Sequence, residues 1–306
     1  VRTLDSHSQF YQKSIEDWPQ GHFTGACIIN TTAAEPPSVA LDNTRAMASG
    51  RSLDVVLWSE TMVTVDQGGE EAFLDAAKAL AKDLNILLGV TYSIEDSTLG
   101  DSYTDRNMFA LLTPQGQEGF RYQKVHPVVG VEDGTAPGTA PAPAVQTRYG
   151  RVGGAICYDF DFPDFLRQAS RGADLMLQPG WDWGPLGLLH ANMDAVRAVE
   201  NGVTVFRCSS GGVSGVYGPY GDVVLQKVTG KWKGTGYIAD IPMRRQVVTV
   251  YSTVGHLGVY VCLGLWGAIM LGSVLTSPQT HQRLRRGSLL LTDSLRRLEP
   301  DPSATP

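Results

Sequence analysis

The sequence lacks a concentration of positive charge over most of its length. Its 306 residues contain 25 lysines and arginines against 31 aspartates and glutamates, and no basic cluster precedes residue 280. Because nucleic-acid binding needs clustered cations to neutralise phosphates, this balance excludes a general nucleic-acid binder. With 42% hydrophobic and 18% charged residues, the chain can bury a full core, which excludes a disordered or fibrous protein.

Cysteine is also scarce. Cys27, Cys157, Cys208 and Cys262 lie far apart and without Cys-x-x-Cys spacing. This pattern favours neither a zinc site nor a disulfide-dense scaffold. Cys27 and Cys208 lie in apolar, strand-like runs, so we expect both to be buried core residues. No cluster of His, Cys and Asp points to a metal, and we expect no metal and no other cofactor.

Long hydrophobic runs are rare, with one exception near the C-terminus. From Leu257 to Leu275 nineteen residues pass without a charge. A helix of that length rises about 28 Å, close to the ~30 Å hydrocarbon core of a membrane. The run therefore predicts a transmembrane helix, and the alternative is a buried core helix. The chain begins with Val1 and shows no secretory leader, which suggests a fragment or a processed form.

Charge around this run predicts an orientation. Two arginines precede it, Arg244 and Arg245, and five follow it, namely Arg283, Arg285, Arg286, Arg296 and Arg297. The positive-inside rule then places the tail in the cytoplasm and the large domain outside. A cytoplasmic location of the whole protein is the alternative.

Apolar runs of strand length alternate with amphipathic stretches. The expected strands are Ala26 to Ile29, Leu53 to Trp58, Asn85 to Tyr92, Asn107 to Leu112, Phe120 to Gln123, Arg151 to Cys157, Asp174 to Leu177, Val203 to Cys208, Val213 to Tyr217 and Val223 to Gln226. The first expected helix is Glu70 to Leu84, whose apolar stripe is Phe73, Ala77, Leu80, Ala81 and Leu84. The second is Leu189 to Glu200, whose apolar stripe is Leu189, Met193, Val196 and Val199. A third helix is expected to start at Pro163. Turns at Pro114 to Gly116 and Gly218 to Gly221 indicate antiparallel hairpins. Together these patterns predict an α/β domain with a mixed sheet or two packed ones.

Chemistry-bearing side chains follow three of the expected strands. Glu60, Lys124 and Cys157 each stand where an apolar run ends. An acid, a cation and a thiol at such edges are the parts that an acyl-transferring thiol enzyme needs. The Pro/Ala/Gly-rich stretch from Gly134 to Ala144 lies between the last two and is expected to form an exposed loop that walls or covers the site.

The motifs around these residues carry a family resemblance. VVLWSET around Glu60, YQKVHPVVGVE around Lys124 and GGAICYDFDFP around Cys157 resemble the nitrilase, or carbon-nitrogen hydrolase, superfamily in order, flanks and spacing. The resemblance continues downstream through GWDWGPLGLLHANMDAVRAVENG. It implies a four-layer α-β-β-α sandwich, an acyl or amide substrate and, as in soluble members, homo-oligomers. It also implies domain limits: an unassigned segment at 1–24, the hydrolase domain at 25–245, an apolar segment at 246–280 and a basic, disordered tail at 281–306.

The resemblance also implies roles for named residues. Glu60 is the general base, Cys157 the nucleophile that carries a thioester, and Lys124 stabilises the oxyanion together with the backbone N–H of Tyr158. Glu132, eight residues after Lys124, supports the lysine or the base. A cation such as Lys124 is expected to lower the thiol pKa toward neutrality.

Several further residues are candidates for the pocket. Trp181 and Trp183 are expected to form its wall, because large flat side chains bury much area with few rotors. Asp182 and His190 are expected to contact substrate, and His126 is a weaker candidate for the same role.

One branch resembles the whole pattern most. Apolipoprotein N-acyltransferases place this domain outside the membrane and follow it with a final membrane helix, which implies a phospholipid donor and an amine acceptor. The chain departs from that branch in reading Pro-Gly-Trp-Asp-Trp at 179–183, where the branch has an Asn-Asp-Ala-Trp-like loop. A soluble amidase or nitrilase and a non-catalytic scaffold are the alternatives.

Overall fold

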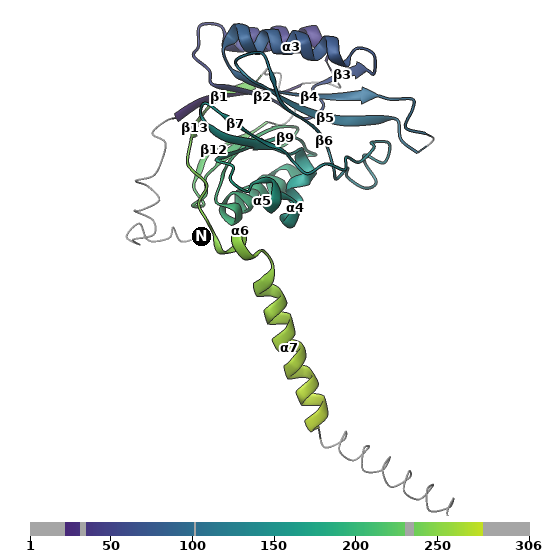
Figure 1. Cartoon of the computed structure of the whole chain (residues 1–306), viewed down its shortest axis with the longest axis vertical. Coiled ribbons are helices and arrows are strands. Elements are labelled where there is room, and N and C mark those ends of the chain that lie inside the picture. The colour runs from purple at the N-terminus through teal and green to yellow at the C-terminus, as the bar shows by residue number, and fades with distance from the viewer. Residues whose placement is uncertain (1–21, 31–34, 101, 230–235, 278–306) are drawn as a thin grey trace, which may run out of the picture. The chain divides into compact units, whose positions relative to one another are not determined.

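The computed structural model describes residues 22–30, 35–100, 102–229 and 236–277 (Figure 1). The chain divides into two compact units, residues 1–253 and residues 254–306. The tail predicted for 281–306 and most of the segment 1–24 lie outside the described residues.

The first unit is built on two mixed sheets. The first sheet has the order β13 (Gly236–Pro242), β1 (His22–Ile28), β2 (Val55–Trp58), β4 (Leu87–Glu95), β5 (Asp105–Leu112), β6 (Glu118–Gln123), with β3 (Val63–Asp66) also paired to β4. The second has the order β12 (Val223–Val228), β11 (Val213–Tyr217), β10 (Thr204–Ser210), β9 (Leu175–Trp181), β8 (Gly150–Gly154), β7 (Ala144–Thr147). In each sheet the central strands are parallel and antiparallel hairpins lie beside them.

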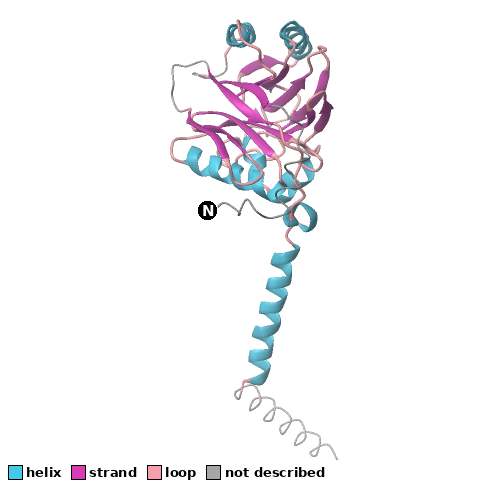
Figure 2. Cartoon of the chain, turned by 90° about the vertical axis from the view of Figure 1, so that its left-hand side faces the viewer, coloured by secondary structure: helices cyan, strands magenta, loops and turns pink. Residues whose placement is uncertain are grey.

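Helices cover the outer face of each sheet. Helices α2 (Pro37–Ala48) and α3 (Glu70–Leu84) lie over the first sheet, and α4 (Pro163–Ala169) and α5 (Leu186–Asn201) lie over the second (Figure 2). The resulting layers confirm the predicted α-β-β-α sandwich. The helix start at Pro163 and the hairpin turns near Gly116 and Gly221 are confirmed as well.

Alternation along each strand divides the apolar side chains between two cores. On β2, Val55 and Leu57 pack between the sheets, whereas Val56 and Trp58 pack under the helices. Helix α3 has the predicted bounds, and its Phe73 ring lies 5.3 Å from the ring of Tyr92. Burying such a side chain contributes about 1.5–3 kcal/mol.

Helix α5 is present, but the face predicted to pack is the wrong one. Leu189 and Val196 of the predicted stripe are 58% and 51% exposed, and the buried face carries Asp194, Arg197 and Asn201. The reason is that α5 packs on polar groups: Arg197 Nε donates to the carbonyl of Phe160 at 3.0 Å. The helix ends at Gly202, whose φ of +65° favours glycine.

The two sheets are joined covalently. Cys27 of β1 and Cys208 of β10 form a buried disulfide, with Cα atoms 5.3 Å apart and a sequence separation of 181. Burial was predicted correctly, but the bond was not, because cysteines this far apart in sequence are brought together only by the packing of two sheets.

The second unit contains α7 (Leu257–Thr276). Among the described residues it is the one helix long and apolar enough to cross a membrane, and none of its residues is buried. Cys262 is exposed on it.

Candidate active site

Glu60, Lys124 and Cys157 line one cavity. Its volume is about 470 Å³, and Asn107, Glu132, Trp181 and Trp183 also line it. Glu60 follows β2 and Lys124 follows β6 in the first sheet, whereas Cys157 follows β8 in the second. The fold therefore brings three strand ends from two sheets to one place.

Glu60 is 3% exposed and is held by two donors on one oxygen. Its Oε1 accepts from Lys124 Nζ at 2.7 Å and from Asn107 Nδ2 at 2.8 Å. The next residue, Thr61, has a φ of +47°, which an L residue rarely adopts. This turn directs the chain away from β2 just after the acid.

Lys124 is fully buried between two carboxylates. Its Nζ lies 2.7 Å from Glu60 Oε1 and 2.7 Å from Glu132 Oε2. Glu132 is itself fixed, because its Oε2 also accepts from the backbone N–H of Val128 at 2.7 Å. A buried ammonium held between two carboxylates has its position in the cavity set by them.

Cys157 begins a 3₁₀ turn, η1 (Cys157–Asp161), with a φ of +46°. Such strained conformations cluster at active sites. The backbone N–H of Tyr158 belongs to the same first turn, where amide groups have no partner within the helix. That amide is the predicted oxyanion donor.

Hydrogen bonds to Asp159 connect the 3₁₀ turn at Cys157 to the segment around Lys124. One carboxylate oxygen, Oδ2, accepts from Tyr122 OH at 2.7 Å and from the N–H of Ile156 at 3.1 Å, and Oδ1 accepts from the N–H of His126 at 2.9 Å. His126 lies beside this carboxylate, with its ring stacked on Phe162, and is absent from the cavity lining.

Burial and charge set the protonation of the three groups. Burial raises the pKa of Glu60, against the opposing effect of Lys124. Burial alone would lower the pKa of Lys124, but Glu60, Cys157 and Glu132 outweigh it and raise that pKa. Burial and the charge of Glu60 raise the pKa of the Cys157 thiol to about 11, against Lys124 and His190. The expected shift of the thiol pKa toward neutrality is therefore wrong for the free site.

Asp182 and His190 lie beside the sulfur and are absent from the cavity lining. The Cys157 sulfur, a carboxylate oxygen of Asp182 and a ring nitrogen of His190 lie within 4.8 Å of one another, a spacing that a metal ion could bridge. However, Asp182 Oδ1 lies 2.8 Å from His190 Nδ1, and its Oδ2 accepts from Arg207 and Ser209. These oxygens are committed to hydrogen bonds, so the donor set fits a polar network better than a metal.

The chain is similar to a known protein family over most of its length. The profile of the family described as carbon-nitrogen hydrolase matches residues 35–248. The chain belongs to the carbon-nitrogen hydrolase family. It is thus an enzyme of the superfamily that its three motifs resemble.

Relatives in the carbon-nitrogen hydrolase family include apolipoprotein N-acyltransferases. The chain is 26% identical to that of Pseudomonas syringae pv. tomato over 243 residues, which cover 72% of this chain and 47% of the relative. It is 30% identical to that of Chlorobaculum tepidum over 128 residues, which cover 40% of this chain and 23% of the relative. The chain thus spans less than half the length of these relatives.

Solved structures of the carbon-nitrogen hydrolase fold resemble the first unit. An amidase from Nesterenkonia sp. AN1 matches with a TM-score of 0.61 and 23% identity, covering 74% of this chain and 93% of the amidase. Another structure of that amidase, 24% identical, carries the acetamide moiety of fluoroacetamide covalently at its active-site cysteine.

Sequence reasoning missed several polar residues of this site. Asn107, Asp159, Asp194 and Arg207 all make buried hydrogen bonds around the catalytic groups. Arg207 could have been found, because a cation in the apolar run Val203 to Cys208 requires a buried partner.

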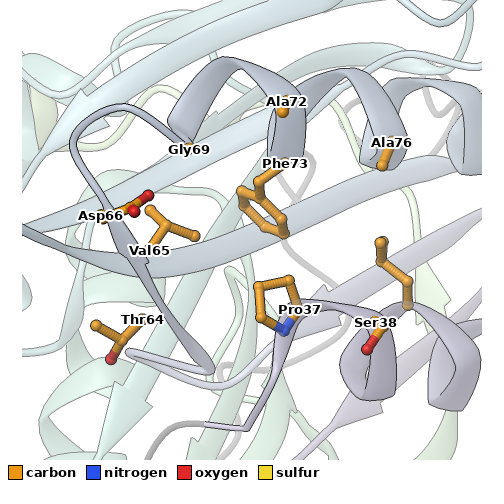
Figure 3. Close-up of a pocket in the computed structure, with 10 residues that line it drawn as sticks. Pro37, Ser38, Thr64, Val65, Asp66, Gly69, Ala72, Phe73 and Ala76 are labelled. Atoms are coloured by element: carbon orange, nitrogen blue, oxygen red, sulfur yellow. The ribbon is translucent and has the colours of Figure 1, made fainter.

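A second groove lies between α2 and α3, away from these residues. It has a volume of about 580 Å³ and is lined by Pro37, Phe73, Ala72 and Ala76, with Asp66 at one edge (Figure 3). None of the predicted catalytic residues lines it.

Proposed function

We propose that this chain is an acyltransferase that forms a thioester on Cys157 and passes the acyl group to an amine. The observation that carries the proposal is the buried contact of Glu60 and Lys124 at 2.7 Å in the cavity that Cys157 also lines. The same cavity could not carry out acyl transfer with any of these three groups missing.

Acylation begins with attack of the Cys157 sulfur on the carbonyl carbon of the donor. Glu60 accepts the thiol proton, and its raised pKa suits this role because the carboxyl must hold that proton until the next step. Negative charge develops on the carbonyl oxygen. Lys124 Nζ and the N–H of Tyr158 stabilise this oxyanion, and one such donor contributes about 3–4 kcal/mol.

Collapse of the tetrahedral intermediate completes the first half. The bond to the leaving oxygen or nitrogen breaks, and Glu60 returns its proton to the leaving group. The product is a thioester on Cys157 with Glu60 again ionised. An amine then attacks the thioester carbonyl, Glu60 accepts the amine proton, and the sulfur leaves with that proton as a thiol.

The donor class follows from the apolar second unit. Helix α7 is long enough to span the hydrocarbon core of a membrane. An enzyme anchored in a membrane meets acyl esters of phospholipids at high local concentration. Together with the likeness to apolipoprotein N-acyltransferases, this supports a phospholipid donor and a membrane location.

The disulfide supports an extracytoplasmic catalytic domain. Disulfides form and persist in oxidising compartments and are rare in the cytosol. The buried Cys27–Cys208 bond therefore agrees with the orientation in which the tail beyond α7 is cytoplasmic.

Hydrolysis of a small amide is the second candidate. The cavity of about 470 Å³ suits a small substrate, and the similar solved structures are amidases. In that case water replaces the amine in the second half of the reaction, with the same three residues.

The test is intact-mass analysis of the full chain in phospholipid vesicles. We expect a mass gain of one acyl group, which a peptide with a free N-terminus removes as an N-acyl product. Release as a free fatty acid, or an adduct formed only with small amides, would support the hydrolase instead. A chain that forms no adduct with either donor would contradict both functions and favour a non-catalytic scaffold.

Two cysteine variants control this experiment. Cys157→Ala should form no adduct. Cys262→Ala removes the other free thiol, which is exposed on α7, and should form the adduct as the parent does.

A further inference from the structure

A histidine lies beside the nucleophile without lining the substrate cavity. His190 of α5 has a ring nitrogen within 4.8 Å of both the Cys157 sulfur and an Asp182 oxygen. Glu60 and Lys124 line the cavity, and His190 does not. The sulfur thus has a second polar neighbour that the acyl-transfer steps described above do not use.

The two ring nitrogens of His190 have different surroundings. Nδ1 lies 2.8 Å from Asp182 Oδ1. Nε2 is buried and has no hydrogen-bond partner among the described residues, although Asp161 Oδ1 lies at 3.5 Å and Asp194 Oδ1 at 3.9 Å. A buried donor without a partner is unfavourable, so a negative charge that forms nearby is stabilised by it.

The surroundings of the ring favour its charged form. Three carboxylates face it, Asp161 from η1, Asp182 after β9 and Asp194 from α5. Arg207 of β10 is fully buried and binds two of them, Asp182 and Asp194. Arg197 of α5 acts on Asp161 from further away and also pairs with Glu200.

The balance of these charges decides the protonation of the ring. Burial alone would lower the pKa of His190, but Asp194 and Asp182 outweigh it and raise the pKa to about 11. The ring also acts on the sulfur, since it lowers the pKa of the Cys157 thiol, as Lys124 does and against Glu60. The phenols of Tyr217 on β11 and Tyr237 on β13 also interact with this network.

We propose that His190 is a charged imidazolium that stabilises negative charge on the Cys157 sulfur, which lies within 4.8 Å of one of its ring nitrogens. Glu60 takes the thiol proton, and His190 keeps its own, so no proton passes between sulfur and ring. When the thioester forms, the sulfur loses its charge and the ring stays charged. This role rests on the proposed function in one respect, that Cys157 is the nucleophile.

The test is the pH dependence of alkylation of Cys157 by iodoacetamide. The experiment uses the full chain with Cys262→Ala, because Cys27 and Cys208 are bonded to each other and Cys157 is then the one free thiol. We expect His190→Gln to lower the alkylation rate at pH 7.5 by at least about tenfold, which corresponds to a rise of one unit in the thiol pKa. For acyl transfer, kcat should fall with KM nearly unchanged, because His190 lies outside the cavity.

Asn201→Ala is the matched control. Asn201 is a buried polar residue of the same helix, and its side chain donates to the carbonyl of Arg197, away from the sulfur. An equal loss of alkylation in Asn201→Ala and His190→Gln would overturn the proposal, as would a parent-like pH profile in His190→Gln.

A second variant covers the case in which His190→Gln does not fold. Asp161→Asn removes one carboxylate charge near Nε2 at a site where the side chain is 19% exposed. Because the ring stays charged and loses a carboxylate that competes with the sulfur for it, Asp161→Asn should raise the alkylation rate at pH 7.5, and a folded Asp161→Asn chain that reacts no faster than the parent would count against the proposal. Alkylation needs no acyl substrate, so it decides the role of His190 even if no acyl-enzyme forms.

Discussion

Asn107 Nδ2 lies 2.8 Å from Glu60 Oε1, the same oxygen that accepts from Lys124. With both donors on Oε1, the other oxygen of Glu60 is left to accept the thiol proton. Asn107 lies within β5, so the sheet itself sets the rotation of the Glu60 carboxylate.

This bond predicts that Asn107→Leu lowers kcat for acylation by about 10–100-fold, because a hydrogen bond to a charged group contributes about 1.5–3 kcal/mol. KM should change little if Asn107 acts through Glu60. The measurement is the acylation rate as a function of pH, and the pH at which the rate falls on the acidic side of this profile should shift. A change in KM alone would mean that Asn107 binds substrate instead.

Lys124→Met should lose both activity and stability. It leaves the buried Glu60 and the partly buried Glu132 without their cation, and breaking a buried pair in this way costs about 3–5 kcal/mol. Glu60→Gln should lose as much activity, at least about 100-fold, with a smaller loss of stability, because the amide oxygen can still accept from Lys124.

Urea denaturation and acylation of the same samples check this difference. Arg121→Met is the control, since Arg121 pairs with Glu70, Glu71 and Glu118 at partly exposed positions. Such pairs contribute about 0–1 kcal/mol. A loss of stability in Lys124→Met no larger than in Arg121→Met would contradict the buried arrangement.

The raised pKa of His190 predicts a pH dependence of stability. Its ordinary value is 6.5 and the folded value is about 11. Because the folded pKa is the higher one, the charged ring stabilises the fold fully below pH 6.5, and this contribution is lost as the pH rises toward 11. Between about pH 6.5 and 8.5 the stability advantage of the parent over His190→Gln should shrink by up to about 1.4 kcal/mol per pH unit. Denaturation curves that keep a constant separation across this window would show that the ring is neutral.

The disulfide predicts a redox-dependent stability. Replacing both Cys27 and Cys208 by Ala should lower the free energy of unfolding by about 2–5 kcal/mol, the usual range for a native disulfide. A reductant should lower the Tm of the parent and of Cys262→Ala, and should leave that of the double variant unchanged. If the parent is insensitive to reductant under unfolding conditions, the bond is absent in solution.

Sequence patterns predicted that Glu60, Lys124 and Cys157 lie together because each follows a strand, and the three line one cavity. The run before Glu60 is apolar on both faces, which marks a central strand, whereas the run before Lys124 alternates and forms the edge strand β6. Helix α3 was predicted with its true bounds because its stripe is apolar at helical spacing and its other face is charged.

The same reasoning failed where polar residues are buried. On α5 the apolar stripe is exposed, because Asp194 and Arg197 are needed inside to hold the network around the sulfur. Strand β13 pairs with β1 from the far end of the domain, and no local pattern specifies such a partner. The disulfide has the same cause, since the two sheets bring Cys27 and Cys208 together.

Because the site is divided between the two sheets, turnover depends on the position of one sheet relative to the other. The acid and the ammonium belong to one layer and the sulfur to the other, so a slip of the layers by one residue, about 3.3 Å, separates them by more than a hydrogen bond. On heating, the enzyme should therefore lose activity while the secondary structure of each layer is still intact. Inactivation should occur at a lower temperature than the loss of the far-UV circular-dichroism signal.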